Sequence, residues 1–280
     1  MCGCDARLRS AGGWNFLAAI LLFVCALSLA SSSVSAADGA HAFDLTSTEL
    51  TILDPDTQQV LGHGHYKVTI VAGGELFQGE NRFLNGEYDL EEQRVERAGN
   101  GAAPRLISYK HSFFNADGSP ESIDALDANT GVLACTHFHG ADAPDVRQLK
   151  TALPADTYVG STQLMLLVGR LREGARDLSM HTFICFPGPR VVALNATPSV
   201  GSVKWPQYPG NLVKIEMTPD LGWIGAFASP FMPRAFGWFD PSDDFNYVGG
   251  MFDRFYRYHH LLMVRAPATP GKTQNSSSLR

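Results

Sequence analysis

The sequence has few basic residues and lacks the short motifs of common catalytic and nucleotide-binding folds. It has 22 Lys and Arg against 28 Asp and Glu, a formal net charge of −6. A protein that neutralises nucleic-acid phosphates needs clustered Lys and Arg, so this balance argues against a nucleic-acid partner. There is no Gly-x-Ser-x-Gly nucleophile elbow, no Gly-x-x-x-x-Gly-Lys-Ser/Thr loop and no dinucleotide-binding glycine motif.

Long hydrophobic runs are also absent, apart from Trp14–Ala30. Arg7 and Arg9 precede this run, and small residues ending at Ala36 follow it, so residues 1–36 are predicted to be a cleaved secretory signal peptide. The predicted location is therefore exported, either periplasmic or extracellular. The alternative is an uncleaved membrane anchor, although a spanning helix needs about 20 apolar residues. In that case this N-terminal helix is the only membrane contact we expect.

Cysteine is scarce, with five residues in the chain. Cys2, Cys4 and Cys25 lie within the predicted signal peptide, which leaves Cys135 and Cys185. An even count in an exported chain predicts a disulfide, and closing this loop would stabilise the fold by about 4 kcal/mol. The bridge requires the two Cα atoms to come within about 7 Å. The alternative is two buried free thiols.

The sequence from residue 37 to 265 is typical of a single β-rich domain, followed by a Pro- and Ser-containing tail at 266–280 that we expect to be disordered. Residues 61–71 alternate between apolar and polar side chains, as a half-buried strand does. Turn signals such as Gly73-Gly74 and Asn85-Gly86 recur along the chain. This pattern predicts a mostly β fold: a large curved antiparallel sheet, a sandwich or an open barrel.

One helix is predicted, at Ser161–Arg172. Its leucines and valine fall at helical spacing, Ser161 or Thr162 could cap its start, and Gly174 follows its end. We expect it to pack on an open face of the sheet or to close one end of a barrel.

Five segments carry a resemblance to known proteins: 64–68, 107–114, 126–131, the helix-bearing segment after Pro154, and 213–217 followed by Pro219. In this order they resemble a loose group of exported bacterial β-sheet proteins of unknown function. Those proteins have a curved antiparallel sheet like that of lipocalins or periplasmic lipoprotein carriers. The resemblance covers roughly residues 60 to 240 and rests on strand and turn patterns. It implies a sheet with an apolar concave side and no known reaction.

Two His-x-His pairs are the candidate metal ligands: His63 with His65, and His137 with His139. Residues two apart on a strand point to the same side, so each pair could offer two imidazoles to zinc or iron. Exposed histidines at strand ends explain all four without a metal, and the sequence favours this interpretation. The charged segment 87–97, which contains Glu91-Glu92, is expected to be a strand or an extended loop, and solvated. No catalytic residue is assigned.

Aromatic residues gather between Trp205 and Tyr258. They indicate a packed core, an apolar ligand cavity or an interaction surface. In the cavity interpretation, the ligand-binding residues would be Trp205, Trp223, Phe227, Trp238 and Tyr256.

The leading hypothesis is a non-enzymatic cell-envelope protein without a cofactor. It would bind a lipid or other apolar small molecule, or another envelope protein. The alternative is a zinc- or iron-dependent enzyme using the two His-x-His pairs. A third possibility is a structural module without a ligand.

Overall fold

The computed structural model describes residues 48–97, 104–185, 188–202, 210–220, 235–254 and 259–266. The predicted signal peptide and the tail beyond Ala266 lie outside these residues. All the described residues belong to the second of two units, Met1–Ala40 and His41–Arg280. Within the described ranges, no helix is long and apolar enough to cross a membrane.

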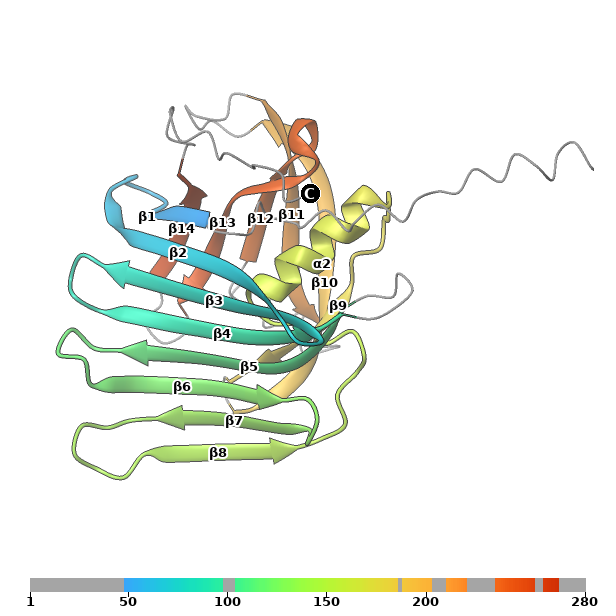
Figure 1. Ribbon diagram of the computed structural model, residues 1–280. Helices are drawn as coiled ribbons and strands as arrows, with labels where there is room; N and C mark the ends of the chain where they lie inside the picture. Colours follow the sequence, from blue (N-terminus) through green and yellow to red (C-terminus); the bar gives the residue numbers. More distant parts are fainter. Residues whose placement is uncertain are drawn as a thin grey trace, which may run out of the picture. The chain divides into compact units, whose positions relative to one another are not determined.

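Within the described ranges, fourteen strands form one antiparallel sheet, as predicted from the alternation and turn signals (Figure 1). Its first eight strands are β1 (Thr48–Leu53), β2 (Val60–Val71), β3 (Gly74–Phe83), β4 (Tyr88–Glu96), β5 (Arg105–Phe114), β6 (Pro120–Asp127), β7 (Val132–His137) and β8 (Asp145–Lys150). The remaining strands are β9 (Met180–Ile184), β10 (Arg190–Ser202), β11 (Asn211–Asp220), β12 (Ala235–Asp240), β13 (Asn246–Arg254) and β14 (His259–Arg265).

The sheet consists of two meanders, which we call the first arm (β1–β8) and the second arm (β9–β14). Within each arm, every strand pairs with its neighbour in the sequence. The arms join where β1 pairs with β14, with Leu50 opposite Arg265. The order places β8 and β9, consecutive in sequence, at the two edges of the sheet.

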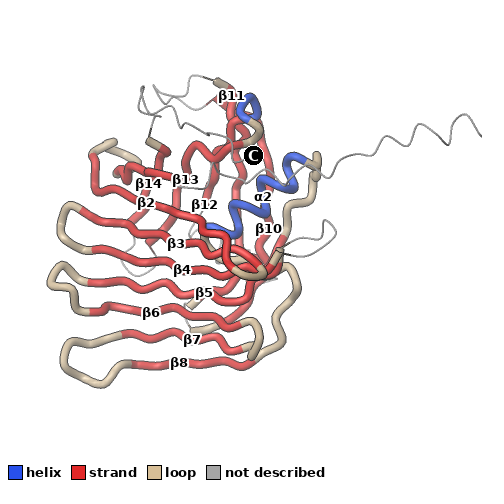
Figure 2. The backbone as a smooth tube through the Cα atoms, viewed as in Figure 1, coloured by secondary structure: helices blue, strands red, loops and turns tan. Residues whose placement is uncertain are grey.

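The single helix labelled in the described part, α2 (Ser161–Arg172), has the predicted bounds and lies against the strands of the sheet (Figure 2). Its buried leucines and valine form one hydrophobic cluster with apolar side chains of β10 to β13. Gly174 has a left-handed backbone (φ 72°) after the last turn, as glycine there permits. The predicted capping by Ser161 or Thr162 is wrong: the N-cap residue is Gly160, which has no side chain to accept a hydrogen bond.

A disulfide between Cys135 on β7 and Cys185, directly after β9, ties the two ends of the sheet together. The Cα atoms lie 5.7 Å apart, within the range that a disulfide allows. The bridge therefore connects the arms at the side where their backbones do not pair.

Strands β4 and β8 depart from the sequence-based expectations. Segment 87–97, which we expected to be solvated, contains β4, in which Asp89, Glu91 and Gln93 are buried. A short 3₁₀ helix, Pro241–Asp243, precedes β13. β8 was not predicted, since its exposed polar side chains show no alternation. The sequence also predicts a strand at 223–228, a segment that lies outside the described residues.

Candidate ligand-binding site

A cavity of about 320 Å³ lies among the first arm, the second arm and α2. Most of its wall is apolar, with Leu164 from the helix and Leu194 and Met217 from the second arm among its contacts. Aromatic rings from both arms complete the wall: Tyr66, Phe77, Tyr109, Phe113, Phe183, Tyr247 and Phe252.

Polar side chains cross this cavity in one row of the first arm. The strand register places Glu91 opposite His111, and His111 opposite Asp124, on β4, β5 and β6. Residues directly opposite each other share a face, with Cβ atoms about 5 Å apart. All three line the cavity. We call Glu91, His111 and Asp124, together with Asp89 of the neighbouring row, the acidic row.

Glycines on β2 and β3 make room for an aromatic ring beside the acidic row. A Cβ on Gly79 would lie 2.5 Å from Cε1 of Tyr66, and one on Gly64 would lie 2.4 Å from Oδ1 of Asn81. The ring of Tyr66 therefore occupies the space that a side chain on Gly79 would fill. This packing brings its hydroxyl within 3.1 Å of Nδ2 of Asn81.

His111 and Asp89 form the centre of a hydrogen-bond network. Nε2 of His111 is 2.9 Å from Oδ1 of Asp89, and Nδ1 is 3.3 Å from the hydroxyl of Tyr109. Nδ2 of Asn81 donates to the same Asp89 oxygen at 2.9 Å. Buried polar groups need such partners, because desolvation without a hydrogen bond is costly.

Glu91 caps α2 from another strand. Its Oε1 accepts hydrogen bonds from the backbone N–H of Ser161 at 3.1 Å and from the Ser161 hydroxyl at 2.9 Å. The amide of Gln93 donates to the same oxygen. Because a helix N-terminus carries partial positive charge, the carboxylate is favourable there. It also supplies the acceptor that Gly160 lacks.

The carboxylates set the protonation of their neighbours. Burial by itself lowers the pKa of His111, but the charges of Asp89, Glu91 and Asp124 and the hydrogen bond to Asp89 raise it, and the net shift is upward from 6.5. Burial raises the pKa of Tyr66 well above 10, and the charges of Glu91 and Asp89 add to the rise. The imidazole therefore carries positive charge over a wider pH range than a free histidine.

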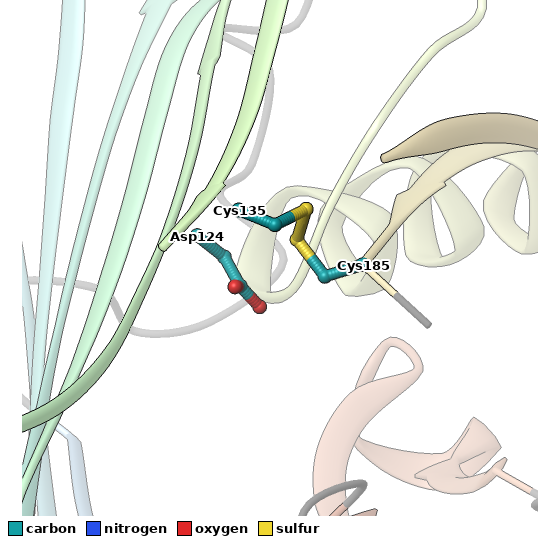
Figure 3. Close-up of side chains that lie close together, drawn as sticks. All are labelled: Asp124, Cys135 and Cys185. Atoms are coloured by element: carbon teal, nitrogen blue, oxygen red, sulfur yellow. A yellow bond between two sulfur atoms is a disulfide. The ribbon is translucent and has the colours of Figure 1, made fainter. Parts of the chain in front are cut away.

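Asp124 lies beside the disulfide, with its carboxyl group directed towards the bridge (Figure 3). One ligand-type atom from each of Asp124, Cys135 and Cys185 lies within 4.8 Å of the others, the one such group of three among the described residues. Thiolate sulfur is the form that binds metals. The two sulfurs are bonded to each other, so the oxidised protein does not offer this ligand set.

The structure does not bring the two His-x-His pairs together. His63 and His65 are exposed on β2, where His65 is 2.8 Å from the carboxylate of Glu49. His137 ends β7, and His139 lies beyond it and is exposed. Strands β2 and β7 have four others between them, which corresponds to about 24 Å along the sheet. A shared site needs imidazoles that converge within about 5 Å.

Trp238 is the one residue of the predicted aromatic ligand set within the described ranges; Trp205, Trp223, Phe227 and Tyr256 lie outside them. It is not among the residues that line the cavity. A Cβ on its neighbour Gly237 would contact Phe239 and Leu164, so Gly237 faces the helix. Alternation along β12 turns Trp238 to the opposite face.

The acidic row was missed because β4 reverses the usual alternation. Asp89, Glu91 and Gln93 are buried, whereas Leu90 and Glu92 between them are exposed. A period of two was visible in the sequence, but the charged members were assigned to solvent. The signal in the sequence is the alternation itself: polar residues recur at every second position of β4, and apolar Leu90 lies between two of them. This pattern could have identified a strand whose polar side chains face inward.

No protein-family model matches the sequence, and no curated protein matches it. Among solved structures, the chain is similar to a β-barrel-like protein of the domain of unknown function DUF1849 from Brucella abortus. The TM-score is 0.44 and the identity 10%, over 79% of this chain and 94% of the other. At these values the likeness supports no inference about activity or ligand.

Proposed function

We propose that this chain is an exported, non-enzymatic binding protein of the cell envelope that takes an apolar small molecule into the cavity between its arms. The carrying observation is the cavity itself, about 320 Å³ with a mainly apolar wall and a few polar groups on one side. Ligand sites in proteins have this character, with volumes of about 300 to 1,000 Å³. The N-terminal sequence and the disulfide support the exported location.

The contacts of His111 favour binding over acid–base catalysis. One ring nitrogen lies at hydrogen-bond distance from Asp89 and the other near the Tyr109 hydroxyl. A general base needs a nitrogen within hydrogen-bond reach of the substrate proton. Both ring nitrogens of His111 instead contact protein atoms, so His111 and Asp89 stabilise the wall of the cavity.

The first experiment is native mass spectrometry with metal analysis of the protein purified from its export compartment. A bound mass of lipid size without metal supports the proposal. Stoichiometric zinc or iron that is lost in His137→Ala would replace it with the metal-dependent alternative. A bound protein would favour an envelope partner.

A dye-binding assay tests the location of the ligand. An environment-sensitive apolar dye should bind the wild-type protein, and Leu164→Phe should weaken dye binding because Leu164 lines the cavity. Leu171→Phe is the matched control, since Leu171 is also buried on α2 but is not in the cavity wall. Equal dye affinity in both variants would contradict the proposed site.

A further inference from the structure

We propose that the acidic row binds the ammonium group of a cationic amphiphile whose apolar chain fills the cavity. This inference rests on the proposed function and specifies the head group of its ligand. The site comprises the carboxylates of Asp89, Glu91 and Asp124.

Negative charge exceeds positive charge on this side of the cavity. Three carboxylates line it, and His111 is the inward-facing cation among the described lining residues. Lys67 also contributes to the lining, but its side chain is exposed and alternates with inward-facing Tyr66 and Val68 on β2. Buried carboxylates are costly unless paired, so a bound cation would offset the remaining charge.

The carboxylates retain capacity to accept hydrogen bonds. The bonds that Asp89 receives from described residues all end on Oδ1, and those of Glu91 all end on Oε1. Oδ2 of Asp89 and Oε2 of Glu91 accept none from the described part of the chain. An ammonium group has three N–H donors and no acceptor, which fits the carboxylate oxygens that β4 and β6 present on either side of His111.

Asn81 provides a second, independent sign of incomplete pairing. It is 3% exposed and lines the cavity, yet its Oδ1 has no hydrogen-bond partner among the described residues. Native proteins satisfy nearly all such atoms. The unpaired atom is an acceptor on the same wall as the carboxylates; it lies over Gly64 and has almost no accessible surface.

Aromatic rings flank the same carboxylates. Tyr109 and Phe113 line the cavity on β5, on either side of His111, and Tyr66 lies across the row on β2. The face of an aromatic ring attracts a cation within about 6 Å. Carboxylates together with rings favour an alkylammonium over a neutral head group, and they repel a fatty acid.

The test compares three ligands of one chain length on the full exported protein: dodecylamine, dodecanol and dodecanoate, each displacing an apolar dye below its micelle concentration. Dodecylamine should bind about tenfold more tightly than dodecanol, since a charge-assisted hydrogen bond has about this effect. Dodecanoate should bind most weakly. Asp124→Asn should lower the dodecylamine affinity about tenfold and leave that of dodecanol unchanged.

Glu92→Gln is the matched control, because Glu92 is an exposed carboxylate beside Glu91 on the other face of β4. It should leave all three affinities unchanged, which separates the cavity from surface charge. Equal affinity for the three ligands, or preference for dodecanoate, would overturn this inference while the apolar cavity stands. Failure of the dye and of every ligand to bind would overturn the proposed function as well.

Discussion

The inner faces of β4 in the first arm and β11 in the second differ in polarity although both strands belong to one sheet. The first arm presents Asp89, Glu91 and Gln93 from a single strand, all buried. The second arm presents Val213, Ile215 and Met217 from β11, all in the main hydrophobic cluster. Burial therefore does not select side-chain type by itself. The polarity of each face follows from the part of α2 that it contacts.

α2 contacts each arm through a different part of its structure. Its leucines pack with the apolar strands of the second arm, whereas its N-terminus meets the carboxylate of Glu91 on the first. A helix flank has only apolar side chains to bury, but a helix start has unpaired N–H groups. The polar stretch of β4 thus meets the end of the helix, and the apolar strands of the second arm pack against its side.

Removing the disulfide should have the largest effect, because it is the one cross-link between the arms in the described part of the chain. The double variant Cys135→Ala, Cys185→Ala should lose about 4 kcal/mol of unfolding free energy for a sequence separation of 50. Urea denaturation of the variant and of wild type, with and without reductant, measures it. Identical midpoints in all four samples would show that the arms close without the bridge.

A cavity in the apolar contact should come next. Leu167 is fully buried on α2, so Leu167→Ala should lower the unfolding free energy by about 3 kcal/mol. Val200→Ala on β10 is the control; Val200 is 76% exposed, so the change should be below about 0.5 kcal/mol. Thermal and urea unfolding would measure both, and equal losses would contradict the packing of α2 on the second arm.

The polar contact of α2 should be weaker but specific. Glu91→Ala removes the acceptor of the Ser161 N–H and should cost about 2 kcal/mol of unfolding free energy. Glu91→Gln retains an acceptor oxygen and should cost less than half as much. Urea titrations of both variants measure the difference. An equal loss would mean that the carboxylate charge, and not the hydrogen bond, holds the helix start.

The pH dependence of the first arm should be the smallest effect. Asp89, Glu91 and Asp124 raise the pKa of His111 above 6.5, against the effect of burial. Because the folded pKa is raised, the stabilisation is full below 6.5 and is lost as the pH rises through the folded pKa. The stability advantage of wild type over His111→Gln should therefore be greater at pH 5 than at pH 9.

An NMR titration of the His111 ring checks the same interaction directly. Its midpoint should lie above 6.5 in wild type and move downward in Asp124→Asn, because one of the three raising charges is lost. A midpoint below 6.5 would indicate that burial outweighs the carboxylates.

Local sequence patterns predict most of the fold but little of the candidate site. Alternation and turn glycines predict the strands, and helical spacing gives α2 its observed bounds. The cysteine count predicts the bridge between Cys135 and Cys185. The row of Glu91, His111 and Asp124 depends instead on the register of three strands, which no local pattern specifies. Its residues are 20 and 13 positions apart and become neighbours only in the sheet.

The pairing of β1 with β14 is a long-range folding event, unlike the local pairing of strands within each arm. Every other strand pair joins neighbours in sequence, so each arm can form by successive hairpins at a small cost in loop entropy. β1 leaves the ribosome first, yet its partner is the last strand of the sheet. A circular permutant that links the two ends and opens between β8 and β9 would make all fourteen strands sequential, and its folding rate would show how much of the barrier this delayed encounter creates.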